Sequence, residues 1–140
     1  MCFSGTPICG KSNMAIETSI DLEFDTERYD VNGDFAGDDP SVFTAPVTGK
    51  YQFNAVVFVS QLDESADYYH CSFLTSNARH RYWFIDPTAL EAPPLYWTAT
   101  GSVLADMDAG DTCMIRWYQQ AGDAVTDFQI DSHWSGYLVC

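Results

Sequence analysis

The segment FTAPVTGKYQFNAVVFV, residues 43–59, decides the fold. Thr48-Gly49 marks a turn, and strict alternation of side chains follows it. One side of this segment is apolar throughout, at Tyr51, Phe53, Ala55, Val57 and Val59. The other side begins with Gln52 and Asn54 and then becomes apolar at Val56 and Phe58. The pattern predicts a long strand over Lys50–Val59, one end of which is covered on both faces by a second sheet or by a neighbouring subunit.

The same alternation recurs along most of the chain. It predicts a half-buried strand over Met14–Phe24, which leaves residues 1–13 as a free N-terminal arm and 14–140 as the folded domain. Asp25–Pro40 is rich in turn residues. Further strands are expected at Ser41–Thr44, around Tyr69–Phe73, and at Arg79–Ile85, Leu95–Met107, Thr112–Gln119 and His133–Val139. Eight to ten short strands without a helical segment indicate an all-β sandwich or jelly roll.

Composition limits the classes of protein that fit. A chain of 140 residues with 46% hydrophobic residues makes one domain with a core and is not disordered. Six basic residues against 20 acidic ones give a net charge of −14, which excludes long-range attraction to nucleic acid or to anionic membranes. No apolar run is long enough to insert into a membrane, and residues 1–11 lack the features of a signal peptide. We therefore expect the protein to be made in a cytoplasm.

The five cysteines do not form a disulfide framework, because their number is odd and their spacing wide. Cys71 and Cys113 alternate with apolar residues, and we expect them to be small buried hydrophobic side chains. Whether Cys2 pairs with Cys9 is left open by the sequence.

Three motifs follow one another along the chain. The first is Phe43 to Phe53, in which a Pro46-x-x-Gly49 turn leads into Tyr51-x-Phe53. The second is Thr100-Gly101-Ser102-Val103-Leu104 followed by the turn Asp108-Ala109-Gly110-Asp111. The third is the ending Trp134-Ser135-Gly136-Tyr137-Leu138-Val139. Together, and in this order, they resemble the signature of C1q-like domains, and the resemblance is assigned to the domain over residues 14–140.

The resemblance implies a C1q/TNF-like jelly roll of about ten antiparallel strands that assembles as a homotrimer. It gives Val56 and Phe58 a role near the three-fold axis, although they could also meet only a loop or the second sheet of the same chain. The residues that the resemblance assigns to the core or the interface are Phe43, Pro46, Gly49, Tyr51, Phe53, Val56, Phe58, Gly101, Gly110, Trp134, Gly136 and Tyr137. In such a trimer the acids should lie on outward turns, away from an apolar interface.

C1q-like heads also occur in bacteriophages, as fibre tips or outer capsid proteins. The sequence shows no collagen repeat, heptads or shaft, so we expect a capsid decoration protein on the virion surface. It would be held to the major capsid protein, or another virion protein, by the trimer base and the 1–13 arm. The alternative is a receptor-binding or glycan-binding head that recognises a host-surface glycan through outer loops.

Sequence motifs for chemistry are weak. No Gly-x-Ser-x-Gly occurs, and we expect no enzyme activity and no cofactor. Asp30, Asn32 and Asp34 begin like a calcium loop, but its sixth and twelfth positions do not fit an EF-hand. The resemblance leaves a calcium site on this acidic loop open, because some C1q-like trimers bind calcium, and the alternative is a solvated acidic turn. The cysteines and histidines lack zinc-site spacing.

Two further groups of residues have both a structural and a binding interpretation. Tyr82, Trp83, Phe84, Tyr96 and Trp97 fit a core or subunit interface better than a sugar site, although both are open. Arg79 and Arg81 are expected to bridge to an acidic neighbour.

Overall fold

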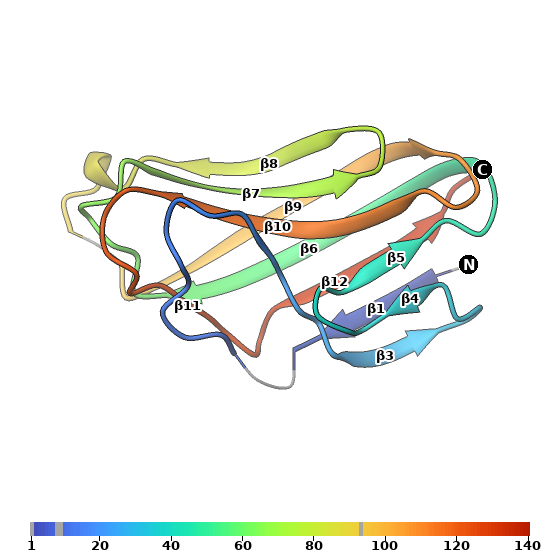
Figure 1. The fold of residues 1–140 in the computed structure, drawn as a ribbon, viewed down its shortest axis with the longest axis horizontal. Coiled ribbons are helices and arrows are strands. Elements are labelled where there is room, and N and C mark those ends of the chain that lie inside the picture. The colour runs from blue at the N-terminus through green and yellow to red at the C-terminus, as the bar shows by residue number, and fades with distance from the viewer. Residues whose placement is uncertain (1, 8–9, 93) are drawn as a thin grey trace.

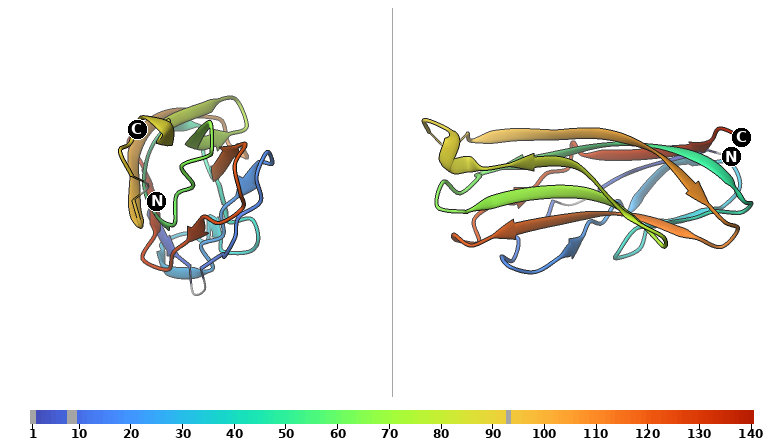
Figure 2. Two further views of the ribbon diagram at one scale, coloured as in Figure 1. Left: turned by 90° about the vertical axis from the view of Figure 1, so that its left-hand side faces the viewer. Right: turned by 90° about the horizontal axis from the view of Figure 1, so that it is seen from above.

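The computed structural model describes residues 2–7, 10–92 and 94–140. Two antiparallel sheets of six strands each lie face to face (Figure 1; Figure 2). The first sheet has the order β11-β6-β12-β1-β3, with β9 on the other side of β6. The second has the order β4-β5-β10-β7-β8, with the short β2 also paired to β10. This confirms the predicted all-β jelly roll.

The strands of the first sheet are β1 (Cys2–Thr6), β3 (Thr26–Asp30), β6 (Gly49–Ser60), β9 (Tyr96–Met107), β11 (Asp127–Phe128) and β12 (His133–Leu138). The strands of the second sheet are β2 (Ile20–Asp21), β4 (Phe35–Ala36), β5 (Val42–Thr44), β7 (Tyr68–Thr75), β8 (Arg79–Ile85) and β10 (Thr112–Gln120). A single 3₁₀ turn, η1 (Pro87–Ala89), is the helical element of the described residues.

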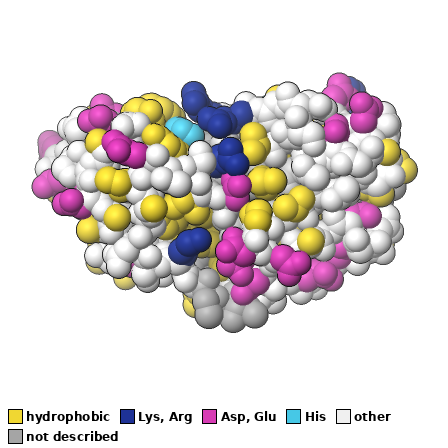
Figure 3. Space-filling model, in the orientation of Figure 1, with side chains coloured by type: hydrophobic (Ala, Val, Ile, Leu, Met, Phe, Trp, Pro, Cys, Tyr) yellow, Lys and Arg dark blue, Asp and Glu magenta, His cyan; other side chains and the backbone are white. Residues whose placement is uncertain are grey.

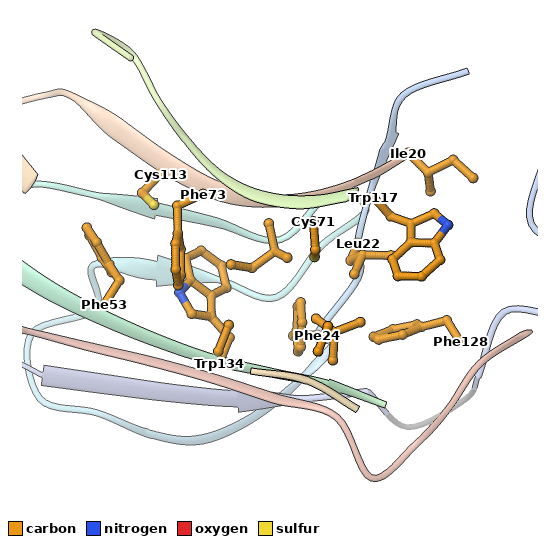
Figure 4. Close-up of a cluster of buried hydrophobic side chains, with 14 of the residues drawn as sticks. Ile20, Leu22, Phe24, Phe53, Cys71, Phe73, Cys113, Trp117, Phe128 and Trp134 are labelled. Carbon is orange, nitrogen blue, oxygen red and sulfur yellow. The ribbon is translucent and has the colours of Figure 1, made fainter. Parts of the chain in front are cut away.

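The core lies between the sheets and is dominated by aromatic rings (Figure 4). The predicted inward side of β6 is buried from Tyr51 to Val59. Phe53 meets Phe73 of the second sheet at a ring-centroid distance of 6.2 Å, and Trp134 of β12 meets Phe53 at 6.4 Å. Truncating one such ring to alanine costs about 3–5 kcal/mol of stability. Cys71 and Cys113 are fully buried in this core, as predicted.

The prediction of a free arm over residues 1–13 is wrong for the part that folds into β1. Cys2–Thr6 pairs on one side with β12 and on the other with β3, inside the first sheet. Phe3 is completely buried, with its ring 4.9 Å from Phe35 and 4.9 Å from Phe43. The sequence signal was hidden because a lone Phe between Cys, Ser and Gly shows no alternation. Cys9 lies outside the described residues, so its pairing with Cys2 stays open.

The long strand predicted over Met14–Phe24 is also wrong, and its predicted inward side is only partly buried, since Thr18 is exposed and Ile16 half-buried. Met14, Ile20, Leu22 and Phe24 are buried, but only Ile20–Asp21 is a strand. The backbone turns at Glu17, whose φ is 54°, and the Glu17 N–H donates to the Gln119 carbonyl. Periodicity reports which side chains are buried and does not show where the backbone leaves the ladder.

Asp25–Pro40 is more structured than its turn residues predicted. It contains β3 and β4, and the turn between them begins at Asp30. The remaining predicted strands are confirmed within one or two residues as β5, β6, β7, β8, β9, β10 and β12.

Candidate functional site

The residues of the C1q-like motifs separate into two groups in the structure. Phe43, Tyr51, Phe53 and Trp134 are buried core side chains. The Tyr51 hydroxyl donates to the Val47 carbonyl at 2.7 Å, which fastens the exposed Pro46–Gly49 turn to the core. Val56, Phe58 and Tyr137, by contrast, point away from the core.

The two inward glycines of these motifs make room for aromatic rings. A Cβ at Gly136 would stand 2.6 Å from a ring carbon of Phe53 and 2.7 Å from one of Phe3. A Cβ at Gly101 would clash with the ring of Tyr82. Gly110 is required for its backbone conformation instead, because its φ of +93° in the turn between β9 and β10 favours glycine.

An uncharged face covers the middle of the outward side of the first sheet, between the Lys50–Asp106 pair at one end and Asp127, opposite Ser60, at the other. Rows of paired residues across β12, β6 and β9 define it: Tyr137–Gln52–Leu104, Ser135–Asn54–Ser102 and His133–Val56–Thr100, followed by Phe58–Thr98 and Ser60–Tyr96. None of these positions holds Asp, Glu, Lys or Arg, in a chain with 26 charged residues. Leu104, Tyr96 and Tyr137 are each about half exposed, and the Phe58 ring stacks on Tyr96 at 5.6 Å. Such a face is suited to contact with protein rather than water.

Asp30 acts as the cap of a turn. Its carboxylate accepts N–H donation from Asn32 at 3.2 Å, Gly33 at 3.0 Å and Phe35 at 2.8 Å. Burial alone would raise the pKa of this carboxyl, but backbone donation, mainly from Phe35 and Asp34, outweighs burial and lowers it. Both oxygens of Asp30 are thus engaged by the backbone of the hairpin. Within the described part of the chain, no three His, Cys, Asp or Glu side chains come close enough together to hold a metal ion, so the zinc candidates are not grouped.

The outward side of the second sheet carries a feature that the sequence analysis missed. Cross-strand registers give the rows Tyr118–His70–Phe84 and Arg116–Ser72–Arg81, with Arg79 opposite Leu74 in the next row. We call this set of residues, with Tyr68, the His70 face. The rings of Tyr118 and His70 stack at 5.2 Å, and those of Tyr68 and Phe84 stack at 5.1 Å.

Two polar atoms of the His70 face are buried without a hydrogen-bond partner among the described residues. They are Nδ1 of His70 and Oγ of Ser72, whose side chains belong to residues only 4% and 0% exposed. Burial, and then the charges of Arg81 and Arg79, lower the pKa of His70 to about 4. The imidazole is therefore neutral at pH 7.

The predicted sugar-site aromatics divide between core and surface. Tyr82 and Trp83 turn inward, where the Tyr82 hydroxyl lies 2.8 Å from Cys71 Sγ and Trp83 stacks on Trp117 at 5.5 Å. Phe84 and Tyr96 are exposed, but on opposite sheets. A bulge in β8 opposite Cys71 and Ser72 produces this change of phase, and alternation alone could not show it.

The expected acidic partners of Arg79 and Arg81 are not found in the described residues. The ion pairs there are Lys50–Asp106 at 2.8 Å and a two-bond pair from Arg116 to Asp21. Arg79 and Arg81 are exposed and face solvent beside Ser72.

Comparison with known proteins agrees with the fold. A family model described as "C1q domain" matches residues 9–139. The chain belongs to the C1q domain family. Similar solved structures include the globular domain of zebrafish complement 1qA protein, at 16% identity and a TM-score of 0.67, covering 99% of this chain and 97% of that one. Eiger TNF from S. frugiperda is 13% identical with a TM-score of 0.67, covering 100% and 92%.

Murine APRIL is 7% identical with a TM-score of 0.65, covering 99% of this chain and 98% of that one. At such identities these likenesses show the fold alone. No match was found among curated proteins. In the residues that the structure describes, no helix has the length and apolarity to cross a membrane.

Proposed function

We propose that this C1q domain is a non-enzymatic structural protein that forms a homotrimer and decorates the outer surface of a bacteriophage capsid. The observation that supports trimer formation is the uncharged face. A chain of net charge −14 repels its own copies, so a self-association surface must be one from which acids are kept away. The five rows of the uncharged face hold no acid, since Asp106 and Asp127 lie at its two ends, and the exposed Tyr96, Leu104 and Tyr137 supply apolar area to bury.

Trimer formation is what C1q- and TNF-like domains typically do, and the shared fold supports it here. Val56 and Phe58, which are only half-buried in the single chain, then gain cover from a second copy. This is also the physical reason for a strand that is apolar on both sides at one end.

Attachment to the capsid is assigned to the base of the trimer. β1 begins opposite the end of β12, with Cys2 paired to Tyr137, so both chain ends lie at one end of the sandwich (Figure 2). Because β1 is part of the sheet, residues 2–6 are not free to serve as a tether, and the attachment surface is a folded one.

Capsid binding tests the proposal. The purified protein, mixed with capsids of the major capsid protein encoded by the same genome, should cosediment at a stoichiometry that is a multiple of three. A Phe58→Asp variant, which puts a charge on the uncharged face, should lose both trimer and capsid binding. Arg28→Gln, an exposed change on β3, is the control. A wild-type trimer that stays in the supernatant would contradict the decoration role.

The second candidate is a receptor-binding or glycan-binding head. One observation favours it, namely the His70 face with its unpartnered polar atoms. A trimer built on the first sheet would leave the second sheet outward, available to a ligand.

A further inference from the structure

The His70 face combines aromatic rings with cations in a strongly acidic protein. Three of the six basic residues, Arg79, Arg81 and Arg116, project from its rows. In the space-filling view, Lys and Arg side chains gather over β8 and β7 beside hydrophobic ones, while the acids lie mostly elsewhere (Figure 3). Arg116 is engaged with Asp21, whereas Arg79 and Arg81 have no ion-pair partner in the described chain. Two free guanidinium groups therefore lie next to each other on the same side of β8.

The polar atoms beneath these arginines point to a missing partner. Ser72 lies between Arg116 and Arg81 in one row, and His70 lies between Tyr118 and Phe84 in the next. A buried hydroxyl or imidazole nitrogen without a hydrogen-bond partner destabilises the folded chain. A ligand group that hydrogen-bonds to these two atoms would remove that cost.

We propose that the His70 face binds a saccharide that carries one carboxylate, such as a uronic acid. Arg81 and Arg79 hold the carboxylate, since planar guanidinium groups pair with carboxylates in two parallel hydrogen bonds. Phe84, which is 59% exposed at the sheet edge, offers its ring to the apolar side of the sugar. His70 Nδ1 and Ser72 Oγ form hydrogen bonds with hydroxyl groups of the sugar once the flexible arginine side chains move aside. The proposal deepens the second candidate function and rests on it.

The charge of the whole protein selects a ligand with a single charge over a polyanion. Long-range repulsion from a chain of −14 opposes the approach of nucleic acid or heavily sulfated chains. A small saccharide with one carboxylate has little such penalty, and at physiological salt it responds mainly to charges within about 8 Å. The local cations then decide binding.

Isothermal titration of the purified, full-length protein tests the site. The probe is a glucuronic acid-containing disaccharide, and its methyl ester is the matched neutral ligand. We expect the ester to bind at least tenfold more weakly. The Arg79→Gln/Arg81→Gln double variant and Phe84→Ala should each lose at least tenfold in affinity. Arg28→Gln and Ile130→Ala, which are exposed changes away from the His70 face, should stay within twofold of wild type.

Thermal unfolding of each variant accompanies the titration, so a loss of binding counts only in a protein that is folded. The proposal is overturned if wild type gives no heat with the disaccharide, if the ester binds equally well, or if the arginine and Phe84 variants bind like wild type. The mass of each sample in solution is measured in parallel. A monomer that binds the disaccharide would refute the trimer and support this site. A trimer that does not bind it would refute this site and support the trimer.

Discussion

The neutral state of His70 makes stability depend on pH in a calculable way. In the folded chain the ring is buried between Tyr68 and Tyr118, with Arg79, Arg81 and Arg116 as the charged groups of the neighbouring strands on that face. Its pKa is lowered to about 4 from 6.5, first by burial and then by Arg81 and Arg79. Between these two pKa values, the unfolded chain therefore binds a proton at His70 that the folded chain does not bind. The stabilisation is complete above pH 6.5 and is lost as the pH falls from 6.5 towards 4.

The size of this effect follows from the two pKa values. Each tenfold difference in proton affinity is worth about 1.4 kcal/mol, so the full loss is about 3 kcal/mol, and about 2 kcal/mol of it has occurred by pH 5. Urea unfolding of wild type and of His70→Gln at pH 7.5 and pH 5 measures it, and the difference between the two proteins isolates this one residue. Carboxylates such as Asp30 and Asp63, whose pKa values lie low because backbone donation outweighs burial, titrate in both proteins and cancel. Equal pH dependence in the two proteins would refute the reasoning.

Three further changes test the packing and the turns. Gly136→Ala should lower stability by about 1–3 kcal/mol in urea unfolding because its Cβ overlaps the rings of Phe53 and Phe3, while Ser135→Ala, outward on the same strand, should change it by less than about 0.5 kcal/mol. Deleting residues 1–6 removes β1 and Phe3 from the first sheet, so circular dichroism should show an unfolded chain; a folded truncated protein would mean that β1 is dispensable. Asp30→Ala should lower the free energy of unfolding by about 1–2 kcal/mol, because three backbone N–H groups lose their acceptor. A rise in the Tm of the wild type on adding calcium, absent in Asp30→Ala, would show that this carboxylate is more than a turn cap.

The strands that the sequence predicted well are those with long, uninterrupted alternation. β6, β9 and β10 each run for nine residues or more, and their inward residues carry enough apolar area to fix the register. The first two C1q-like motifs were informative for the same reason, since each joins a turn to such a strand.

The elements that the sequence did not reveal are held by contacts far apart in the chain. β1 is anchored by a single ring, Phe3, inserted among aromatics of four other strands. The backbone N–H groups of Met14 and Glu17 donate to the carbonyls of Thr126 and Gln119, which lie more than a hundred residues later in the chain. Neither arrangement leaves a local pattern to read.

The candidate sites were partly visible in the sequence. Val56 and Phe58 stood out because they break the polar phase of β6, and their outward position is as expected. The His70 face did not stand out, because its members come from three strands and a bulge shifts the phase of β8 between Arg81 and Trp83. A face built by cross-strand rows becomes visible only when the register is known.

The mass of the protein in solution is the most direct test of the central claim, that the uncharged face joins three copies. Size-exclusion chromatography with light scattering at micromolar concentration should give three times the 15.6 kDa chain, about 47 kDa. Phe58→Asp should reduce this mass to that of a single chain, and Phe84→Ala, an exposed aromatic change on the other sheet, should leave it unchanged. A monomeric wild type, or a trimer that survives Phe58→Asp, would contradict the account.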